Sequence, residues 1–170
     1  MKKYELIREG KLFRIIALKD FGFIKKGELG GLIEKESNLS QKNECWVYKN
    51  AEVTGNALVY GNAEVTGNAL VHENAEVSGN ALVYGKASVS GNALVYGNAE
   101  VTGNARVGAN ASVSGKCFSF RYIISKGDYI ESLNYNNLLK LLLLNLNLIY
   151  DKMNKTDLKN FSFYKSNEKD

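Results

Sequence analysis

His72 and the two cysteines, Cys45 and Cys117, are the residues of this 170-residue chain best suited to chemistry. A histidine can act as a general base near neutral pH. Because His72 is the only histidine, a site with three histidines on a metal is excluded by count. We therefore expect no catalytic residue, no metal and no cofactor. A base role for His72 stays open, but the surrounding pattern has no interruption that would form a pocket.

His72 also has a structural explanation. The residue after each valine in this region alternates between an aromatic and a hydroxyl side chain, as in Tyr60, Thr66, His72 and Ser78. His72 thus occupies a tyrosine position that faces outward. We favour a surface variant of that position over a binding contact, and a binding contact over a general base.

The region between the cysteines has a strict period of six. Alanine precedes most of its valines by two positions, and Gly-Asn fills most of the gaps. This period fits neither an α-helix nor a single hairpin, so it predicts a solenoid of short strands and tight corners. The valines are Val47, Val53, Val59, Val65, Val71, Val77, Val83, Val89, Val95, Val101, Val107 and Val113.

The period predicts the path of the coil. In Ala57–Tyr60 the side chains alternate in and out as in a strand, and Gly61-Asn62 supplies a corner. Three such units close a triangle of 18 residues, so we expect about four turns over residues 45–117, with all valines inward in three columns. The two cysteines should then lie roughly 19 Å apart along the axis. That excludes a disulfide, so we expect small buried residues in a reducing compartment.

The small-x-aliphatic pattern at a period of six resembles the hexapeptide-repeat left-handed β-helix proteins. With Gly-Asn-Ala at the corners, it is most similar to a transferase-like bacterial and phage group. The resemblance covers residues 4 to 117 and implies an all-β solenoid with a left-handed parallel β-helix. Its start is also similar, in the segments Leu18–Phe21, Lys26–Leu32, Asn38–Ser40 and Cys45–Val47.

Different patterns flank the repeat. Residues 1–44 contain two strand-like runs, Tyr4–Ile7 and Leu12–Leu18, and should form a β cap over the open end of the coil. Residues 118–170 should form a C-terminal helical cap and a polar tail, with helical periodicity from Asp128 to Tyr150. We thus predict three parts, with the β-helix at 45–117.

Charge and hydropathy limit the partners. The repeat carries four Lys/Arg against five Glu, so we do not expect it to bind nucleic acid. The charged start favours no signal peptide, and the richest apolar run, Leu138–Tyr150, is too short to span a membrane. We therefore expect a soluble, cytoplasmic protein with no membrane partner.

The outward side chains include large apolar residues that recur every 12 positions. A structural explanation is that the aromatic rings pack against the aliphatic part of glutamate side chains in the neighbouring turn. A contact surface for a protein partner, or for a homo-oligomer, explains them functionally. The candidate binding residues are Trp46, Tyr48, Leu58, Tyr60, His72, Leu82, Tyr84, Leu94 and Tyr96.

Two functions from different classes follow. The first is a non-catalytic β-solenoid for interaction or scaffolding, and the resemblance implies phage or mobile-element proteins that bind and inhibit a host protein. The second, which the resemblance also implies, is a hexapeptide-repeat acyltransferase, active or decayed. The uninterrupted period over residues 47–113 favours the first.

Overall fold

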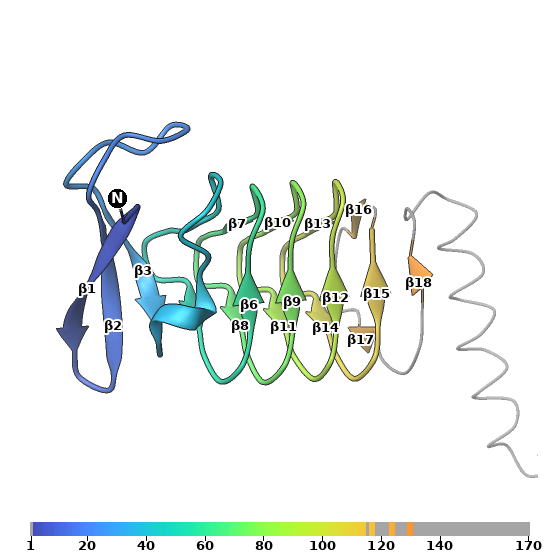
Figure 1. Ribbon diagram of the computed structural model, residues 1–170. Helices are drawn as coiled ribbons and strands as arrows, with labels where there is room; N and C mark the ends of the chain where they lie inside the picture. The colour runs from blue at the N-terminus through green and yellow to red at the C-terminus, as the bar shows by residue number, and fades with distance from the viewer. Residues whose placement is uncertain (1, 115, 118–122, 125–128, 131–170) are drawn as a thin grey trace, which may run out of the picture. The chain divides into compact units, whose positions relative to one another are not determined.

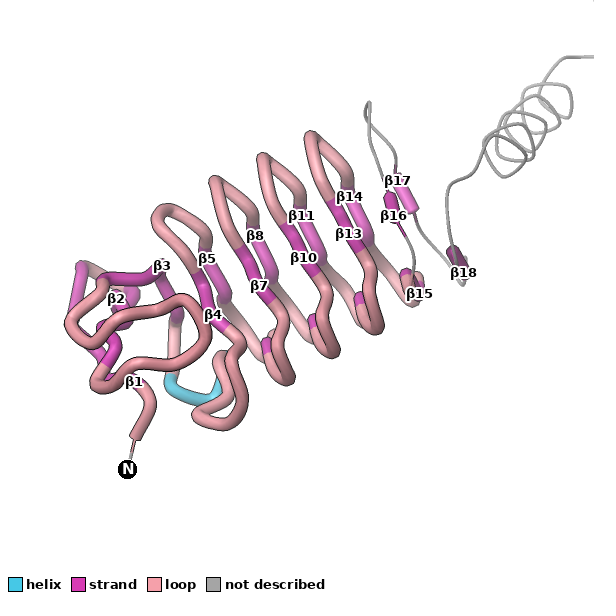
Figure 2. Tube along the Cα trace, turned by 90° about the horizontal axis from the view of Figure 1, so that it is seen from above, coloured by secondary structure: helices cyan, strands magenta, loops and turns pink. Residues whose placement is uncertain are grey.

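The computed structural model describes residues 2–114, 116–117, 123–124 and 129–130 (Figure 1). Within these residues an antiparallel cap leads into a parallel β-solenoid, as predicted. Three sheets form the walls of the coil, and successive turns stack side by side along its axis (Figure 2). The left-handed sense implied by the resemblance stays a prediction.

The cap begins with a hairpin of β1 (Tyr4–Glu9) and β2 (Leu12–Ala17), which pair in antiparallel register. Strand β3 (Leu29–Ile33) pairs with β2 on one edge. On its other edge β3 runs parallel to the first strand of the coil wall, with Ile33 opposite Val53. A single 3-10 turn, η1 (Glu36–Asn38), then leads toward the first full turn. The cap thus covers the open strand edge of the coil, as predicted.

The coil consists of two-residue strands, and each pairs with the strand of the next turn. The first sheet continues from β3 through β5 (Glu52–Val53), β8 (Leu70–Val71), β11 (Ser88–Val89), β14 (Arg106–Val107) and β17 (Ile123–Ile124). The second contains β4 (Trp46–Val47), β7 (Glu64–Val65), β10 (Leu82–Val83), β13 (Glu100–Val101) and β16 (Lys116–Cys117). The third contains β6 (Leu58–Val59), β9 (Glu76–Val77), β12 (Leu94–Val95), β15 (Ser112–Val113) and β18 (Tyr129–Ile130). We call their outer surfaces the β5 face, the β4 face and the β6 face.

The valines form the predicted core. Val65 pairs with Val83 and Val83 with Val101, and the other two sheets repeat this register. None of the twelve valines is more than 1% exposed, and the alanines that precede them are equally buried. Because each slot has an identical neighbour above and below, the core is three continuous columns of small apolar side chains.

The coil continues beyond the end expected from the sequence. The second and third sheets have five strands each, where we predicted about four, because β16, β17 and β18 add a level. Tyr129–Ile130 is therefore strand where the helical pattern was expected to begin, and residues 131–150 of that pattern lie outside the described residues. In the second sheet Cys117 pairs in register with Val101.

The corners combine a left-handed glycine with an asparagine. Gly79 has φ 69°, and a Cβ there would lie 2.8 Å from the backbone N and O of Gly97 in the next turn. In two of the three columns of corners the asparagine side chains donate to one another from turn to turn, as from Asn56 to Asn74 at 3.2 Å and from Asn62 to Asn80 at 3.1 Å. The corners are therefore hydrogen-bonded ladders that set the distance between turns.

In the part of the chain that the structure describes, we find no helix with the length and apolar character needed to cross a membrane.

Candidate functional site

The outward residues of the coil lie on three different faces. Tyr48, Leu82 and Tyr84 lie on the β4 face, and His72 lies on the β5 face. Leu58, Tyr60, Leu94 and Tyr96 lie on the β6 face. We call each strand level of a face a rung. Rungs with leucine or an aromatic residue alternate with rungs of glutamate or serine, because 12-residue repeats wind on 18-residue turns, and Arg106 ends this alternation on the β5 face. The nine candidate residues therefore do not form one continuous surface.

Trp46 is not part of any surface. The sequence pattern places it outward, but the cap covers it completely. Its ring packs edge-on against Phe21 at 5.3 Å and against Tyr4 at 6.1 Å between ring centroids. The prediction that Trp46 extends an exposed patch is wrong, because side chains from the cap bury the first rung of the β4 face.

One tyrosine on the β4 face and one on the β6 face each bond to a glutamate one turn later. Tyr60 Oη donates to Glu76 Oε2 at 3.0 Å, and Tyr84 Oη donates to Glu100 Oε1 at 2.7 Å. Burial, followed by the negative charges of Glu64 and Glu28, raises the pKa of Tyr48 to about 12. Tyr60 and Tyr84 therefore have a structural role, since their hydroxyls connect neighbouring turns.

The leucines of the β6 face remain exposed. Leu58 is 38% exposed and Leu94 is 42% exposed, on two rungs separated by the Glu76 rung. A hollow of about 530 Å³ lies at the cap end of this face, lined by Leu58 and Tyr60 on one side and by the segment 36–41 on the other. The β6 face therefore combines exposed apolar side chains with a concave end.

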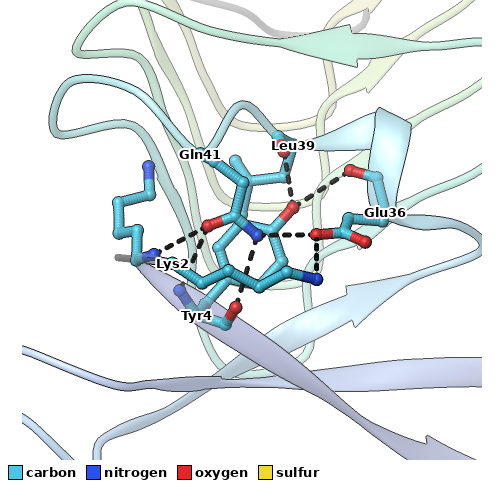
Figure 3. Close-up of polar contacts among 6 residues, drawn as sticks. Lys2, Tyr4, Glu36, Leu39 and Gln41 are labelled. Carbon is cyan, nitrogen blue, oxygen red and sulfur yellow. Dashed lines mark hydrogen bonds and ion pairs between the residues drawn. The ribbon is translucent and has the colours of Figure 1, made fainter.

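A polar network fixes the wall of this hollow (Figure 3). Tyr4 Oη donates to the carbonyl oxygens of Leu39 at 2.5 Å and Glu36 at 3.0 Å. The Gln41 side chain accepts from the backbone N–H of Lys3 at 2.8 Å and donates to Glu36 Oε1 at 3.0 Å. The hydrogen bond from Lys2 holds the pKa of Glu36 below its usual value, so this carboxylate is charged. The rim of the hollow thus contains a salt bridge between Lys2 and Glu36 and the hydrogen bonds around it.

A second hollow, of about 360 Å³, lies on the β4 face beside the cap turn Phe21–Ile24. Tyr48, Glu64 and Leu82 line it from the coil, and Glu44 lines it from the segment before β4. Phe23, at the tip of the turn, is 93% exposed. Sequence reasoning missed this site because the cap is outside the repeat.

His72 is half-exposed on the β5 face. Its Nε2 lies 3.3 Å from Ser88 Oγ, and its Nδ1 lies 3.9 Å from a carboxylate oxygen of Glu73. In a catalytic triad a serine is the nucleophile, a histidine is its base, and a carboxylate orients the histidine. Neither hollow described above is lined by His72. The 3.9 Å separation is longer than a hydrogen bond, so Glu73 does not orient His72 as the acid of a triad would.

Lys3 and Cys45 form a buried pair under the cap. Lys3 Nζ donates to the Cys45 carbonyl at 2.8 Å and lies 3.3 Å from Cys45 Sγ. Burial lowers the pKa of Lys3 and raises the pKa of the Cys45 thiol. Cys45 is a free, buried thiol, as expected. The ammonium ties β1 to the first turn, a role that the lysine doublet at the start of the sequence does not reveal.

Metal ligands do not gather in the described part of the chain. Residues 2–114 and the three short strands that follow contain no group of three or more His, Cys, Asp or Glu side chains placed to hold an ion.

Comparison with known proteins gives two matches. A family model described as the YdcK β-solenoid repeat matches residues 75–91. A relative from Escherichia coli (strain K12) with the printed name "Uncharacterized acetyltransferase YdcK" is 34% identical over 73 residues. That match covers 34% of this chain and 22% of the relative's length. With the period of six and the three stacked columns, these findings support a similarity of this chain to the hexapeptide-repeat β-helix proteins.

Proposed function

We propose that this chain acts by binding a protein partner on the β6 face, as a rigid module without chemistry of its own. The observation that carries this proposal is the exposure of Leu58 and Leu94 on one flat sheet wall. One rung lies between them, so they are about 10 Å apart, a spacing that suits two anchors of one interface. The backbone that carries these leucines is already ordered by the hydrogen bonds of the sheet. Binding of a partner therefore costs little further backbone conformational entropy.

The charge around the β6 face favours one kind of partner. Glu36 borders the hollow, and Glu76 lies between the two exposed leucines. Lys2 neutralises Glu36, so Glu76 is the carboxylate that favours a partner surface with a basic residue beside its apolar side chains. Inhibition of a host protein by a phage or mobile-element protein is the more specific form of this proposal.

The chain contains a closely matched pair of variants for this test. Leu94 and Leu70 are both 42% exposed, and each lies between a glutamate rung and a serine rung. They differ in their face, since Leu94 is on the β6 face and Leu70 is on the β5 face. We expect Leu94→Thr to weaken capture of a host-lysate protein by about tenfold, and Leu70→Thr to leave it within about twofold. Equal effects of the two variants would exclude the β6 face as the binding surface.

An acetyltransferase activity is the second candidate function. Two observations favour it, the printed name of the E. coli relative and the placement of His72 between Ser88 and Glu73. If the chain transfers acetyl groups, acetyl-CoA turnover by the purified protein should be lost in His72→Ala and retained in Leu94→Thr. Under the binding proposal neither variant shows turnover, and His72→Ala captures the partner normally.

A further inference from the structure

The turn Phe21–Ile24 holds an exposed aromatic ring in a fixed position. Backbone hydrogen bonds close it in both directions, from Phe21 N to Ile24 O at 3.1 Å and from Ile24 N to Phe21 O at 2.8 Å. Phe21 packs on the buried Trp46, and Ile24 is 3% exposed, so both flanks of the turn are anchored. Phe23 between them is 93% exposed. A large aromatic side chain on an anchored turn is typical of residues that dominate a protein interface.

The hollow beside this turn has the matching chemistry. Leu82 and Tyr48 give it an apolar floor, and Glu44 and Glu64 give it carboxylates. The segment that bears Phe23 contains Lys25 and Lys26. Lys25 bonds to Asp20 at 3.1 Å, so Lys26 is the better donor of positive charge. An aromatic ring with a neighbouring cation therefore lies next to an apolar hollow with neighbouring anions.

We propose that two copies of this chain associate about a two-fold axis through this surface, with Phe23 of each copy in the hollow of the other. Two-fold symmetry requires one patch to contain both complementary elements, and this patch does. In this arrangement Lys26 of each copy approaches the carboxylates of the other copy. This surface lies on the β4 face and the cap, so it is separate from the β6 face of the proposed function.

Sedimentation equilibrium of the full chain over a concentration series tests this inference. We expect the wild-type protein to show a monomer–dimer equilibrium, and Phe23→Ser to raise the dimer dissociation constant by about tenfold or more. Because Phe23 is almost fully exposed, this substitution leaves the fold intact. Ile7→Ser is the matched control, since Ile7 is an exposed apolar residue at another place in the cap and should leave the dimer unchanged.

Charge reversal tests the pairing of the two elements. Lys26→Glu and Glu44→Lys should each weaken the dimer, and the double variant should restore it, because the reversed charges are again complementary. Lys11→Glu makes the same charge change in the β1–β2 turn and is the control. A double variant as weak as either single variant would overturn the proposed pairing.

Other outcomes have definite meanings. A wild-type chain that is monomeric at all concentrations, or that forms trimers, overturns the two-fold dimer. If the chain is monomeric and Phe23→Ser abolishes its capture of a host protein, the hollow binds a different protein. That result also overturns the two-fold dimer. The β6-face proposal is tested by Leu94→Thr and stands or falls separately, because that substitution should leave the dimer unchanged.

Discussion

Tyr84 and Glu100 lie one turn apart on the β4 face, and the tyrosine hydroxyl donates to the glutamate carboxylate at 2.7 Å. Tyr60 and Glu76 repeat this relationship on the β6 face at 3.0 Å. Since the tyrosine follows one valine and the glutamate precedes the valine of the next turn, the two side chains are 16 residues apart in both pairs. Neighbouring turns are thus joined by side-chain hydrogen bonds on the outside of the coil, in addition to the backbone hydrogen bonds within its sheets.

Removal of this hydroxyl should cost stability. We expect Tyr84→Phe to lower the free energy of unfolding by about 1 kcal/mol, because it deletes a half-buried hydrogen bond to a charged acceptor. Tyr60→Phe is the comparison, and its effect should be smaller because Tyr60 is 41% exposed. Urea unfolding of both variants measures the difference. A larger loss for Tyr60→Phe than for Tyr84→Phe would contradict this account.

The valine columns should be the main source of stability. Val83 is fully buried between Val65 and Val101, so Val83→Ala should lower the free energy of unfolding by about 1–3 kcal/mol. Val83→Asp should cost several times more, because it buries a carboxylate among apolar side chains. Glu64→Gln, on the outer side of the same sheet, is the control, and a comparable loss there would refute the role of the column.

Substitution of two glycines should distinguish the cost of a left-handed backbone conformation from the cost of a steric clash between turns. Gly10 and Gly79 have nearly the same φ, 64° and 69°, but a Cβ at Gly10 meets nothing within 4 Å whereas a Cβ at Gly79 meets Gly97. We expect Gly10→Ala to cost about 1 kcal/mol, from the left-handed conformation alone. Gly79→Ala should cost at least twice as much. Thermal unfolding of the two variants decides the point, and equal losses would mean that the turns move apart easily.

Tyr48 should make the folded chain sensitive to alkali. Its pKa is raised to about 12 in the folded state, against 10.0 for the unperturbed side chain. Between these values the folded protein keeps a proton that the unfolded chain has lost, so the free energy of unfolding falls as the pH rises from 10 toward 12.

Comparison with Tyr48→Phe isolates this contribution. The variant should lose less stability than the wild-type protein between pH 10 and the raised pKa, as measured by urea unfolding at a series of pH values. A steeper decline for the variant would show that Tyr48 does not retain its proton. Cys45, whose pKa is also raised, contributes equally to both proteins and cancels in the comparison.

The sequence predicts the coil because every feature of the coil is local. A buried slot recurs at each sixth residue, and Gly-Asn marks each corner, so Val83 or Gly79 can be placed without knowledge of distant residues. The last level was missed because the spacing changes there. Ile124 follows its partner Val107 by 17 residues, and Cys117 follows Val101 by 16.

The candidate surface was harder to predict, because distant contacts decide it. Trp46 has an outward position in the repeat, yet Tyr4 and Phe21 bury it from elsewhere in the chain. The hollow beside Phe23 is formed by the cap and three turns of the coil together. No periodicity in the sequence records which segment of the cap lies over which rung.

The alternation of rungs determines how many turns can be added to this coil without placing like residues next to each other. Leu82 has Glu64 on one side and Glu100 on the other, so a face returns to the same residue type only after two turns. Insertion of a single turn would place leucine beside leucine and glutamate beside glutamate, with like charges in contact. On the β4 and β6 faces, insertion of 36 residues, twice the 18-residue turn, keeps each leucine between glutamate or serine residues. A gene duplication or a designed extension of this solenoid should therefore add turns in pairs.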